Sequence, residues 1–194
     1  MNHTQEEVMQ FVKEQDVRFV KLSFCDIFGD LRNINISSKE LERAFNSGIS
    51  FDASAIKGFL NIDESDLFLF PDASTLSVLP WRPSQGRVVR LYCAIRRPDG
   101  SSFEGDARTL LKETADQAAL DGYPMTIGPE CEFYLFKRDE NGTPTHEPLD
   151  RGTYFDAAPF DKGENIRREI CLTLEQMGFY TERSHHEGGP GQNE

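Results

Sequence analysis

The sequence lacks paired cysteines, long apolar runs and a secretion signal. Its four cysteines stand far apart and form no C-x-x-C pair, which argues against a zinc knuckle or a disulfide framework and fits a reducing cytoplasm. No apolar run approaches the roughly 20 residues of a membrane-spanning helix. The N-terminal stretch MNHTQEEVMQ has neither the basic nor the apolar block of a signal peptide. We therefore expect a cytoplasmic protein with no membrane partner.

Positive charge is also scarce. The 194 residues include 21 Lys and Arg against 33 Asp and Glu, which gives a net charge of −12. This balance argues against nucleic acid or an anionic membrane as a partner, because both attract clustered basic residues. An anionic substrate is still compatible, provided that bound divalent cations invert the local field. With 38% hydrophobic residues, the chain is long enough for one large domain or two small ones.

Two capping boxes mark helix starts in the first half of the chain. Thr4 with Glu7 predicts a short first helix, and Ser37 with Glu40 predicts a second one that ends near Gly48. Around these helices, apolar alternation bounded by turn residues predicts strands. The strand candidates are residues 17–26, 32–36, 66–72, 76–81 and 87–95, the first two forming a hairpin. The first hundred residues therefore predict a small mixed sheet with one or two helices.

The composition changes after the turn signal RRPDG, and residues 101–106 are typical of a linker. Asp106 is placed to cap a helix that runs to about residue 121. Its apolar positions are expected to face inward, namely Leu110, Leu111, Ala115, Ala118 and Ala119. This change of composition divides the chain into a first domain over residues 1–103 and a second over residues 104–194.

The second domain is expected to contain both strands and helices. The pattern predicts a strand over residues 124–136, a turn at Asn141-Gly142, a helix over residues 163–177 and a strand over residues 179–187. Together with the mixed sheet of the first domain, this order indicates an α+β protein.

The stretch GPECEFYLF, residues 128–136, carries two carboxylates inside a predicted strand. Glu130 and Glu132 are two positions apart, so on a strand they face the same way, about 6.6–6.8 Å apart along the chain. Uncompensated buried carboxylates are costly, so this face meets either a cation or open water. A solvated sheet face is the simpler interpretation of such a pair. Tyr134 and Phe136 share the acidic face, however, which makes plain solvation less natural and favours a metal role.

The last residues, SHHEGGPGQNE, form a second acidic patch. They place His185, His186, Glu187 and Glu194 around a Gly-Gly-Pro-Gly bend that is able to fold the two carboxylates toward each other. With Glu130 and Glu132 on a neighbouring strand, four carboxylates would converge. Oxygen-rich sites of this kind suit Mg²⁺ and Mn²⁺ rather than zinc, and they often hold two ions about 3.5–4 Å apart. Taken alone, the bend is only a loop, and the histidines are typical of an ordinary half-buried pair.

The motifs together resemble the bacterial, type I glutamine synthetases. GPECEFYLF, RGTYFDAAPFD and SHHEGGPGQNE stand in the order and approximate spacing of that family, and SFDASAIKGF followed by DESDLFLFPDAST is similar to its N-terminal loop and strand. The resemblance runs from about Val17 through Glu194 and rests on several separate motifs, so it is specific for the superfamily.

The resemblance implies a fold and an assembly. It implies a β-grasp-like N-terminal domain over residues 1–103 and, over residues 104–194, the beginning of a catalytic domain with an antiparallel curved sheet and flanking helices. Family members are more than twice as long, so the chain resembles their N-terminal portion, and we expect it to have no ligase activity by itself. The resemblance also implies a cytoplasmic homo-oligomer, a dodecamer of two stacked hexameric rings.

The resemblance also implies roles for the acidic residues. Glu130 matches the carboxylate on the metal ion nearer the nucleotide phosphates. The three carboxylates on the other ion match Glu132, Glu187 and Glu194. In the family, both ions are Mg²⁺ or Mn²⁺. ATP is the co-substrate. Glu182 matches a position where the family contacts ATP, and His185 lies beside that nucleotide region.

The implied reaction is the ATP-dependent ligation of ammonia to L-glutamate, which gives glutamine through γ-glutamyl phosphate. Tyr154 and Asp52 match residues that line the ammonium pocket, where the aspartate takes a proton from ammonium. In the family, this aspartate reaches into the active site of the adjacent subunit, so one site needs two chains. Asp52, Tyr154 and Glu187 are therefore the residues expected to take part in catalysis. By itself, Asp52 is more typical of an Asx turn.

Two substitutions separate the loop around Asp52 from the family pattern. The family usually has Phe-Asp-Gly-Ser-Ser-Ile, whereas this chain has Ala53 and Ala55 at the third and fifth positions. Ala55 removes a hydroxyl near the ammonium pocket, and Ala53 has no easy access to positive φ. A less polar pocket is in keeping with a branch of the superfamily that ligates glutamate to larger amines. Two interpretations without ligase activity stay open as well, a noncatalytic truncated module and a plain acidic metal-binding domain.

Overall fold

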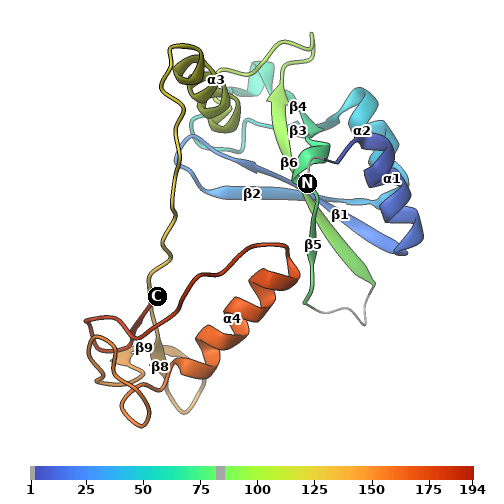
Figure 1. The fold of residues 1–194 in the computed structure, drawn as a ribbon. Helices are drawn as coiled ribbons and strands as arrows, with labels where there is room; N and C mark the ends of the chain where they lie inside the picture. The colour runs from blue at the N-terminus through green and yellow to red at the C-terminus, as the bar shows by residue number, and fades with distance from the viewer. Residues whose placement is uncertain (1–2, 82–85) are drawn as a thin grey trace. The chain divides into compact units, whose positions relative to one another are not determined.

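The computed structural model describes residues 3–81 and 86–194. The chain divides into two compact units, Met1–Met125 and Thr126–Glu194, which are described separately (Figure 1). No helix among the described residues is both long and apolar enough to cross a bilayer. The domain boundary expected after residue 103 stays a prediction.

The first unit is built on one mixed sheet. Its strands are β1 (Val17–Cys25), β2 (Leu31–Ser37), β3 (Ile49–Asp52), β4 (Asp66–Pro71), β5 (Ser77–Leu79) and β6 (Arg87–Arg96). Their order is β2-β1-β6-β4-β3, with β5 also paired to β6. Strands β1 and β6 are parallel and the other pairs are antiparallel. The predicted mixed sheet and the predicted hairpin of its first two strands are confirmed.

Helices α1 (Gln5–Glu14) and α2 (Leu41–Ser47) pack on this sheet. The capping box of Thr4 and Glu7 is present as predicted, because each side chain accepts a hydrogen bond from the other's backbone N–H. The second capping box was wrong. The Ser37 hydroxyl accepts from the Lys39 N–H, residues 38–40 form a 3-10 turn, and α2 starts only after it. Gly48 ends α2 with φ of 72°, as its position predicted.

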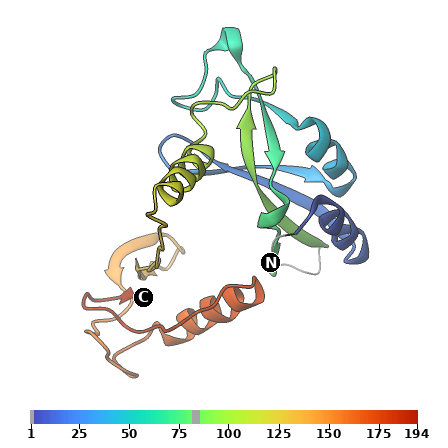
Figure 2. The same cartoon turned by 45° about the horizontal axis from the view of Figure 1, so that its top comes forward.

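The core of the first unit lies between the sheet and these two helices (Figures 1 and 2). Alternate residues of β4 and β6 are buried, as expected for strands with one face on a core. The largest fully buried apolar side chains are Leu22, Leu41, Leu67, Leu69, Leu91, Ile95, Val8, Val20 and Val89. The apolar alternation of the sequence therefore becomes one continuous hydrophobic core.

Helix α3 (Ala107–Leu120) begins where it was predicted, but its side chains do not pack as predicted. Asp106 caps it by accepting from the Arg108 N–H, and the same carboxylate accepts from the Ile95 N–H of β6. None of the helix residues is buried, and Leu110 and Leu111 are 60% and 64% exposed. The predicted inward face holds only in part, because Ala115 and Ala118 are half-buried whereas Leu110, Leu111 and Ala119 are exposed. The cap starts the helix, but burial of its side chains depends on an opposing surface that the local pattern does not report.

The second unit contains one long helix and short strands. Helix α4 (Glu164–Gln176) confirms the helix predicted over residues 163–177. The strands are β7 (Phe133–Tyr134), β8 (Phe136–Arg138), β9 (Pro144–Pro148) and β10 (Gln192–Asn193), with β8 paired to β9 and β10 paired to β7. The predicted turn at Asn141-Gly142 joins β8 to β9, and Gly142 has φ of 80°.

Two predicted strands of this unit were wrong. Residues 124–132 form no strand, so Glu130 and Glu132 lie in the segment that precedes β7, and Cys131 between them is exposed. The strand predicted over residues 179–187 is reduced to one isolated bridge between His186 and Asn193. A strand needs a neighbour to receive its hydrogen bonds. Among the described residues, 124–132 have no strand partner, and of 179–187 only residues 185–187 pair, with 192–194.

Candidate functional site

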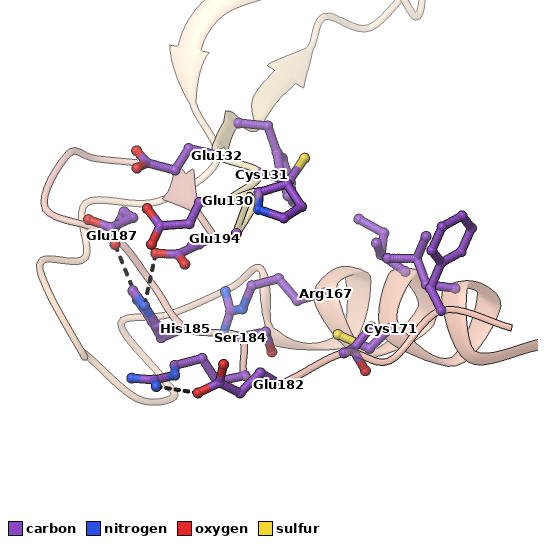
Figure 3. A pocket seen from close by; sticks show the side chains of 18 of the residues that line it. Glu130, Cys131, Glu132, Arg167, Cys171, Glu182, Ser184, His185, Glu187 and Glu194 are labelled. Atoms are coloured by element: carbon purple, nitrogen blue, oxygen red, sulfur yellow. Dashed lines mark hydrogen bonds and ion pairs between the residues drawn. The ribbon is translucent and has the colours of Figure 1, made fainter. Parts of the chain in front are cut away.

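The second unit encloses an open cavity of about 880 Å³. Its walls are residues 128–133, one side of α4, residues 179–185 and the side chains of Tyr154, Glu187 and Glu194 (Figure 3). It is lined by seven of the residues that the sequence singled out: Glu130, Glu132, Tyr154, Glu182, His185, Glu187 and Glu194. The structure therefore brings together the predicted site residues of this unit.

The tightest group in the cavity consists of His185, Glu187 and Glu194. One ligand atom from each lies within 4.8 Å of the other two. His185 Nδ1 is 3.4 Å from a Glu187 oxygen, and His185 Nε2 is 3.1 Å from a Glu194 oxygen. Figure 3 shows the imidazole reaching toward both carboxylates. His185 thus lies among the metal-ligand candidates, although the resemblance associates it with the nucleotide.

The backbone of residues 185–194 folds these side chains together. His185 and Glu194 exchange two backbone hydrogen bonds of 3.1 Å, and the Glu187 N–H donates to the Gln192 carbonyl at 2.9 Å. The Gly-Gly-Pro-Gly stretch forms the bend between the two arms. We call residues 185–194 the ligand hairpin. Its closure places Glu187 and Glu194 on the same side of the cavity.

The two glutamates of GPECEFYLF differ in their surroundings. Glu132 accepts a hydrogen bond of 2.8 Å from the Gln192 side chain, which ties it to the bend of the ligand hairpin. Glu130 extends toward Glu194 (Figure 3) and acts on it electrostatically. Burial raises the pKa of Glu194, as do its contact with Glu187 and the charge of Glu130, whereas His185 opposes the rise. The cavity is therefore a region of crowded negative charge, which a bound cation would relieve.

Aromatic rings cover one side of His185. The Tyr154 ring stacks on Phe155 with centroids 4.0 Å apart, and both rings meet the His185 imidazole edge-on. Phe155 has φ of 62°, in the left-handed region that bulky side chains rarely adopt. Its N–H donates to the His186 carbonyl, which ties this turn to the ligand hairpin. Phe155 was not predicted from the sequence, because no sequence pattern indicates a phenylalanine with positive φ.

Glu182 lines the cavity and is exposed. Its carboxylate pairs with Arg183, and this hydrogen bond lowers the pKa of Glu182. Among the described residues, its side chain is hydrogen-bonded to Arg183 and not to the ligand hairpin.

Asp52 belongs to the first unit, at the end of β3, and is described apart from the cavity. It forms the Asx turn that its sequence predicted, accepting 2.9 Å and 2.6 Å hydrogen bonds from the Ser54 N–H and hydroxyl. These bonds lower its pKa. The loop does not need glycine at the next position, because Ala53 is fully buried and is not among the residues with positive φ.

Comparison with known proteins identifies the family. Residues 16–98 match the family model described as the glutamine synthetase beta-Grasp domain, and residues 104–194 match that of the glutamine synthetase catalytic domain. The chain belongs to the glutamine synthetase family. The predicted resemblance is confirmed, as is the α+β fold with a β-grasp domain followed by part of a catalytic domain. Asp52 lies in the match to the first domain, and the cavity lies in the match to the second.

Curated glutamine synthetases agree with this assignment. The chain is 50% identical over 192 residues to glutamine synthetase of Clostridium saccharobutylicum, and the match covers 99% of this chain and 43% of that protein. It is 47% identical to glutamine synthetase of Methanosarcina mazei, over 98% of this chain and 43% of that protein. The chain therefore spans less than half the length of these glutamine synthetases.

The fold also matches solved structures. A cryo-EM structure of Plasmodium falciparum glutamine synthetase gives a TM-score of 0.78 at 22% identity, over 98% of this chain and 43% of that one. A structure of apo GmaS without ligand gives a TM-score of 0.79 at 25% identity, over 96% of this chain and 43% of that one. These likenesses support the fold of the glutamine synthetase family.

A set of buried polar residues supports the cavity, and apart from His186 its members were missed by sequence reasoning. It consists of Asp150, Asp161, Arg167, His186 and Asn193, each at most 6% exposed. His186 was expected to be half-buried and is 1% exposed. The other four stand among charged and polar residues in the sequence, and nothing in their spacing separates them from a solvated surface. Only the assembled unit reveals that they are buried and hydrogen-bonded to one another.

Proposed function

We propose that the protein carrying this chain ligates ammonia to L-glutamate, with ATP as co-substrate and γ-glutamyl phosphate as the intermediate. The observation that carries the proposal is the convergence of Glu130, His185, Glu187 and Glu194 on one cavity, in the part of the chain that matches the catalytic domain. A concentration of carboxylates is what a reaction between two anions needs, because it holds the cations that screen them.

The donor atoms of the cavity fit a hard divalent cation. The close group of His185, Glu187 and Glu194 offers carboxylate oxygens and one imidazole, while Cys131 and Cys171 line the cavity outside that group. Such donors suit Mg²⁺ or Mn²⁺. In our proposal Glu130 holds one ion, and Glu132, Glu187 and Glu194 hold the other. When bound, the two ions supply charge neutralisation and alignment for phosphoryl transfer.

The remaining site residues bind and orient the substrates. Glu182 contacts ATP, and His185 lies beside the nucleotide region. Tyr154 lines the ammonium pocket with its ring against His185. Asp52 is a carboxylate at neutral pH, like any aspartate with an ordinary or lowered pKa. In our proposal this carboxylate attracts ammonium and receives its proton before attack on the γ-glutamyl phosphate.

The proposal includes an assembly and a location. Asp52 acts in the active site of an adjacent subunit, so the working enzyme is a homo-oligomer, with two stacked hexameric rings as the expected form. We place it in the cytoplasm, without nucleic acid or membrane partners. Because the chain spans 43% of its relatives, we expect residues 1–194 alone to be inactive.

A larger amine is the second candidate for the nitrogen substrate. Ala55 stands where the family usually has serine, and this change removes a hydrogen-bonding hydroxyl close to Asp52. A site that loses a polar contact discriminates less strongly in favour of a small polar substrate. The chemistry at glutamate and ATP is the same for both candidates.

The two candidates are separated by measuring phosphate release from ATP and glutamate in the natural protein. Ammonium is compared with methylamine, ethylamine and other primary amines, each with Mg²⁺ and with Mn²⁺. We expect ammonium to give the highest kcat/KM, and the Glu194→Gln variant to lose activity with every amine. A strong preference for an organic amine would replace ammonium in the proposal. Full activity of Glu194→Gln would overturn the proposed metal site.

A further inference from the structure

The ligand hairpin is held at both of its arms by buried side chains that lie outside the cluster of metal-ligand candidates. One arm carries His186 next to Glu187, and the other carries Asn193 next to Glu194. His186 and Asn193 face each other across the hairpin, and they are 1% and 0% exposed. Each arm is therefore anchored by the residue beside a candidate ligand.

The first anchor is Arg167 of α4. Its Nη1 and Nη2 donate to the two oxygens of Asp161 at 3.1 Å and 2.6 Å, and its Nη1 also donates to Asn193 Oδ1 at 2.6 Å. Arg167 and Asp161 are both buried. A planar guanidinium with a two-pronged partner has a fixed orientation. Arg167 therefore fixes the position of Asn193, and with it the backbone that carries Glu194.

The second anchor is Asp150. Its carboxylate accepts from His186 Nε2 at 2.9 Å and from the backbone N–H groups of Gly191, Lys162 and Gly152 at 3.0 Å, 2.9 Å and 3.2 Å. One side chain thus ties the His186 arm to the far end of the bend and to two loops outside the hairpin. His186 Nδ1 donates in turn to the Glu187 carbonyl at 2.6 Å.

Two glycines leave space for these anchors. A Cβ added at Gly163 would lie 2.2 Å from Asn193 Oδ1, and one added at Gly152 would lie 2.7 Å from His186 Nε2. Neither glycine has positive φ, so backbone conformation does not require glycine at these positions. Close approach of the backbone to the anchoring side chains is what excludes a side chain there.

The buried ion pair of Arg167 and Asp161 needs an explanation other than stability. Replacing a buried ion pair by apolar residues of similar volume is often neutral or stabilising, so such a pair is weak evidence for stability. Arg167 even has a buried Nε that lacks a hydrogen-bond partner among the described residues. The pair instead fixes geometry, because its hydrogen bonds hold both the ligand hairpin and the loop that carries Asp161 in position.

We infer that Arg167 and Asp150 are positioning residues, which hold the two arms of the ligand hairpin. They keep Glu187 and Glu194 in the position relative to Glu130 and Glu132 that divalent-cation binding requires. The inference rests on the proposed function, because it takes these glutamates as the ligands. Neither positioning residue belongs to the close group of His185, Glu187 and Glu194. Residues that orient metal ligands from behind typically change metal affinity by 10–100-fold when they are altered.

The test uses a double substitution that removes the anchor without leaving a buried charge unpaired. Asp161→Asn with Arg167→Met eliminates both charges together, which avoids the penalty of breaking only one side of the pair. The matched control is Glu164→Gln with Arg168→Met, an ion pair on the same helix that is exposed and far from the hairpin in the hydrogen-bond network. Mn²⁺ binding is measured by EPR in the natural protein and in both variants, well below their melting temperatures.

We expect the dissociation constant for Mn²⁺ to rise about 10-fold or more in the Asp161/Arg167 variant and to stay unchanged in the control. The EPR spectrum of the remaining bound Mn²⁺ should broaden, because the ligands no longer hold one geometry. A residue that only stabilises the fold would lower the melting temperature and leave both the affinity and the spectrum of the folded protein unchanged. That result would overturn the inference.

A second, milder variant serves if the double variant does not fold. Gly163→Ala displaces the Asn193 side chain without changing any charge, and it should weaken Mn²⁺ binding in the same direction. Unchanged affinity in folded Gly163→Ala would count against the inference. Wild-type protein that binds no Mn²⁺ would overturn the proposed function and the inference with it. Wild-type binding together with unaltered binding in the folded variants would overturn the inference alone.

Discussion

The two units of the chain are stabilised in different ways. All the buried apolar side chains of the described residues lie in the first unit, between Val8 and Phe103. The buried side chains of the second unit are polar or charged, and Asp150, Arg167 and His186 are examples. Hydrophobic burial is non-directional, whereas hydrogen-bonded charge fixes geometry. The first unit is thus built for stability, and the second is built to place particular atoms around a cavity.

Breaking the buried ion pair from one side should give the largest effect. Arg167→Met leaves Asp161 buried without its partner, and removing one member of a buried pair typically costs about 3–5 kcal/mol. We expect the second unit to lose that stability in urea denaturation. Arg168→Met removes an exposed pair from the same helix and should cost about 1 kcal/mol or less. Equal effects of the two substitutions would contradict the polar network as the structural basis of this unit.

The first unit should respond to loss of apolar volume. Leu91 is fully buried in β6, and Leu91→Ala should lower the free energy of unfolding by about 2–5 kcal/mol. Leu110→Ala on the exposed face of α3 should change it by about 0.5 kcal/mol or less. Urea denaturation of both variants checks the contrast. A comparable loss in Leu110→Ala would mean that α3 packs on the core after all.

Acid should weaken the second unit through Asp150. Burial raises the pKa of this carboxylate, but hydrogen bonds from the Lys162 backbone, from His186 and from other N–H groups outweigh it and lower the pKa to about 2 from 3.8. Between these two values the unfolded chain binds more protons than the folded one, so stability rises with pH there. The contribution of about 2 kcal/mol is present above pH 4 and is lost as the pH falls toward 2.

Hydrogen exchange at low pH measures this contribution. Protection of the Gly191 and Lys162 amides, which Asp150 holds, should fall between pH 4 and pH 2 in the wild type. Asp150→Asn should show weaker protection at pH 5 and a flatter pH profile. The same pH dependence in the variant would assign the acid sensitivity to other carboxylates.

The sequence predicted the first unit well because its core is periodic. Alternating apolar residues in β4 and β6 indicate strands directly, and the cap at Thr4 marks the start of α1. The failures came where structure depends on a partner. The inward face of α3 and the strand over residues 124–132 both required a neighbouring surface, and no local pattern reports whether one is present.

The site was predictable in its ligand candidates but not in its supports. Glu187 and Glu194 stand out because a glycine-rich bend separates them, and family motifs add Glu130 and Tyr154. Arg167 did not stand out, because a buried arginine on α4 has the same sequence signature as its exposed neighbour. Such residues are recognised only when burial and hydrogen bonds are known.

The smallest expected effect concerns the strained turn beside His185. Phe155→Gly removes the side chain that opposes a φ of 62°, which relieves backbone strain but deletes the ring stacked on Tyr154. These contributions are each about 1 kcal/mol and opposite in sign, so the melting temperature should change little. If the proposed function holds, the KM for ammonium should rise, because Tyr154 loses its support. A melting temperature lower by many degrees would show that Phe155 serves stability instead.

Mn²⁺ titration of the natural protein, followed by EPR, tests the central claim most directly. We predict that wild-type protein binds Mn²⁺ and that Glu187→Gln and Glu194→Gln each weaken this binding at least about 10-fold, while a substitution in the first unit such as Leu110→Ala leaves it unchanged. Binding that is the same in wild type and in both glutamine variants would contradict the account, because the ligand hairpin would then hold no cation.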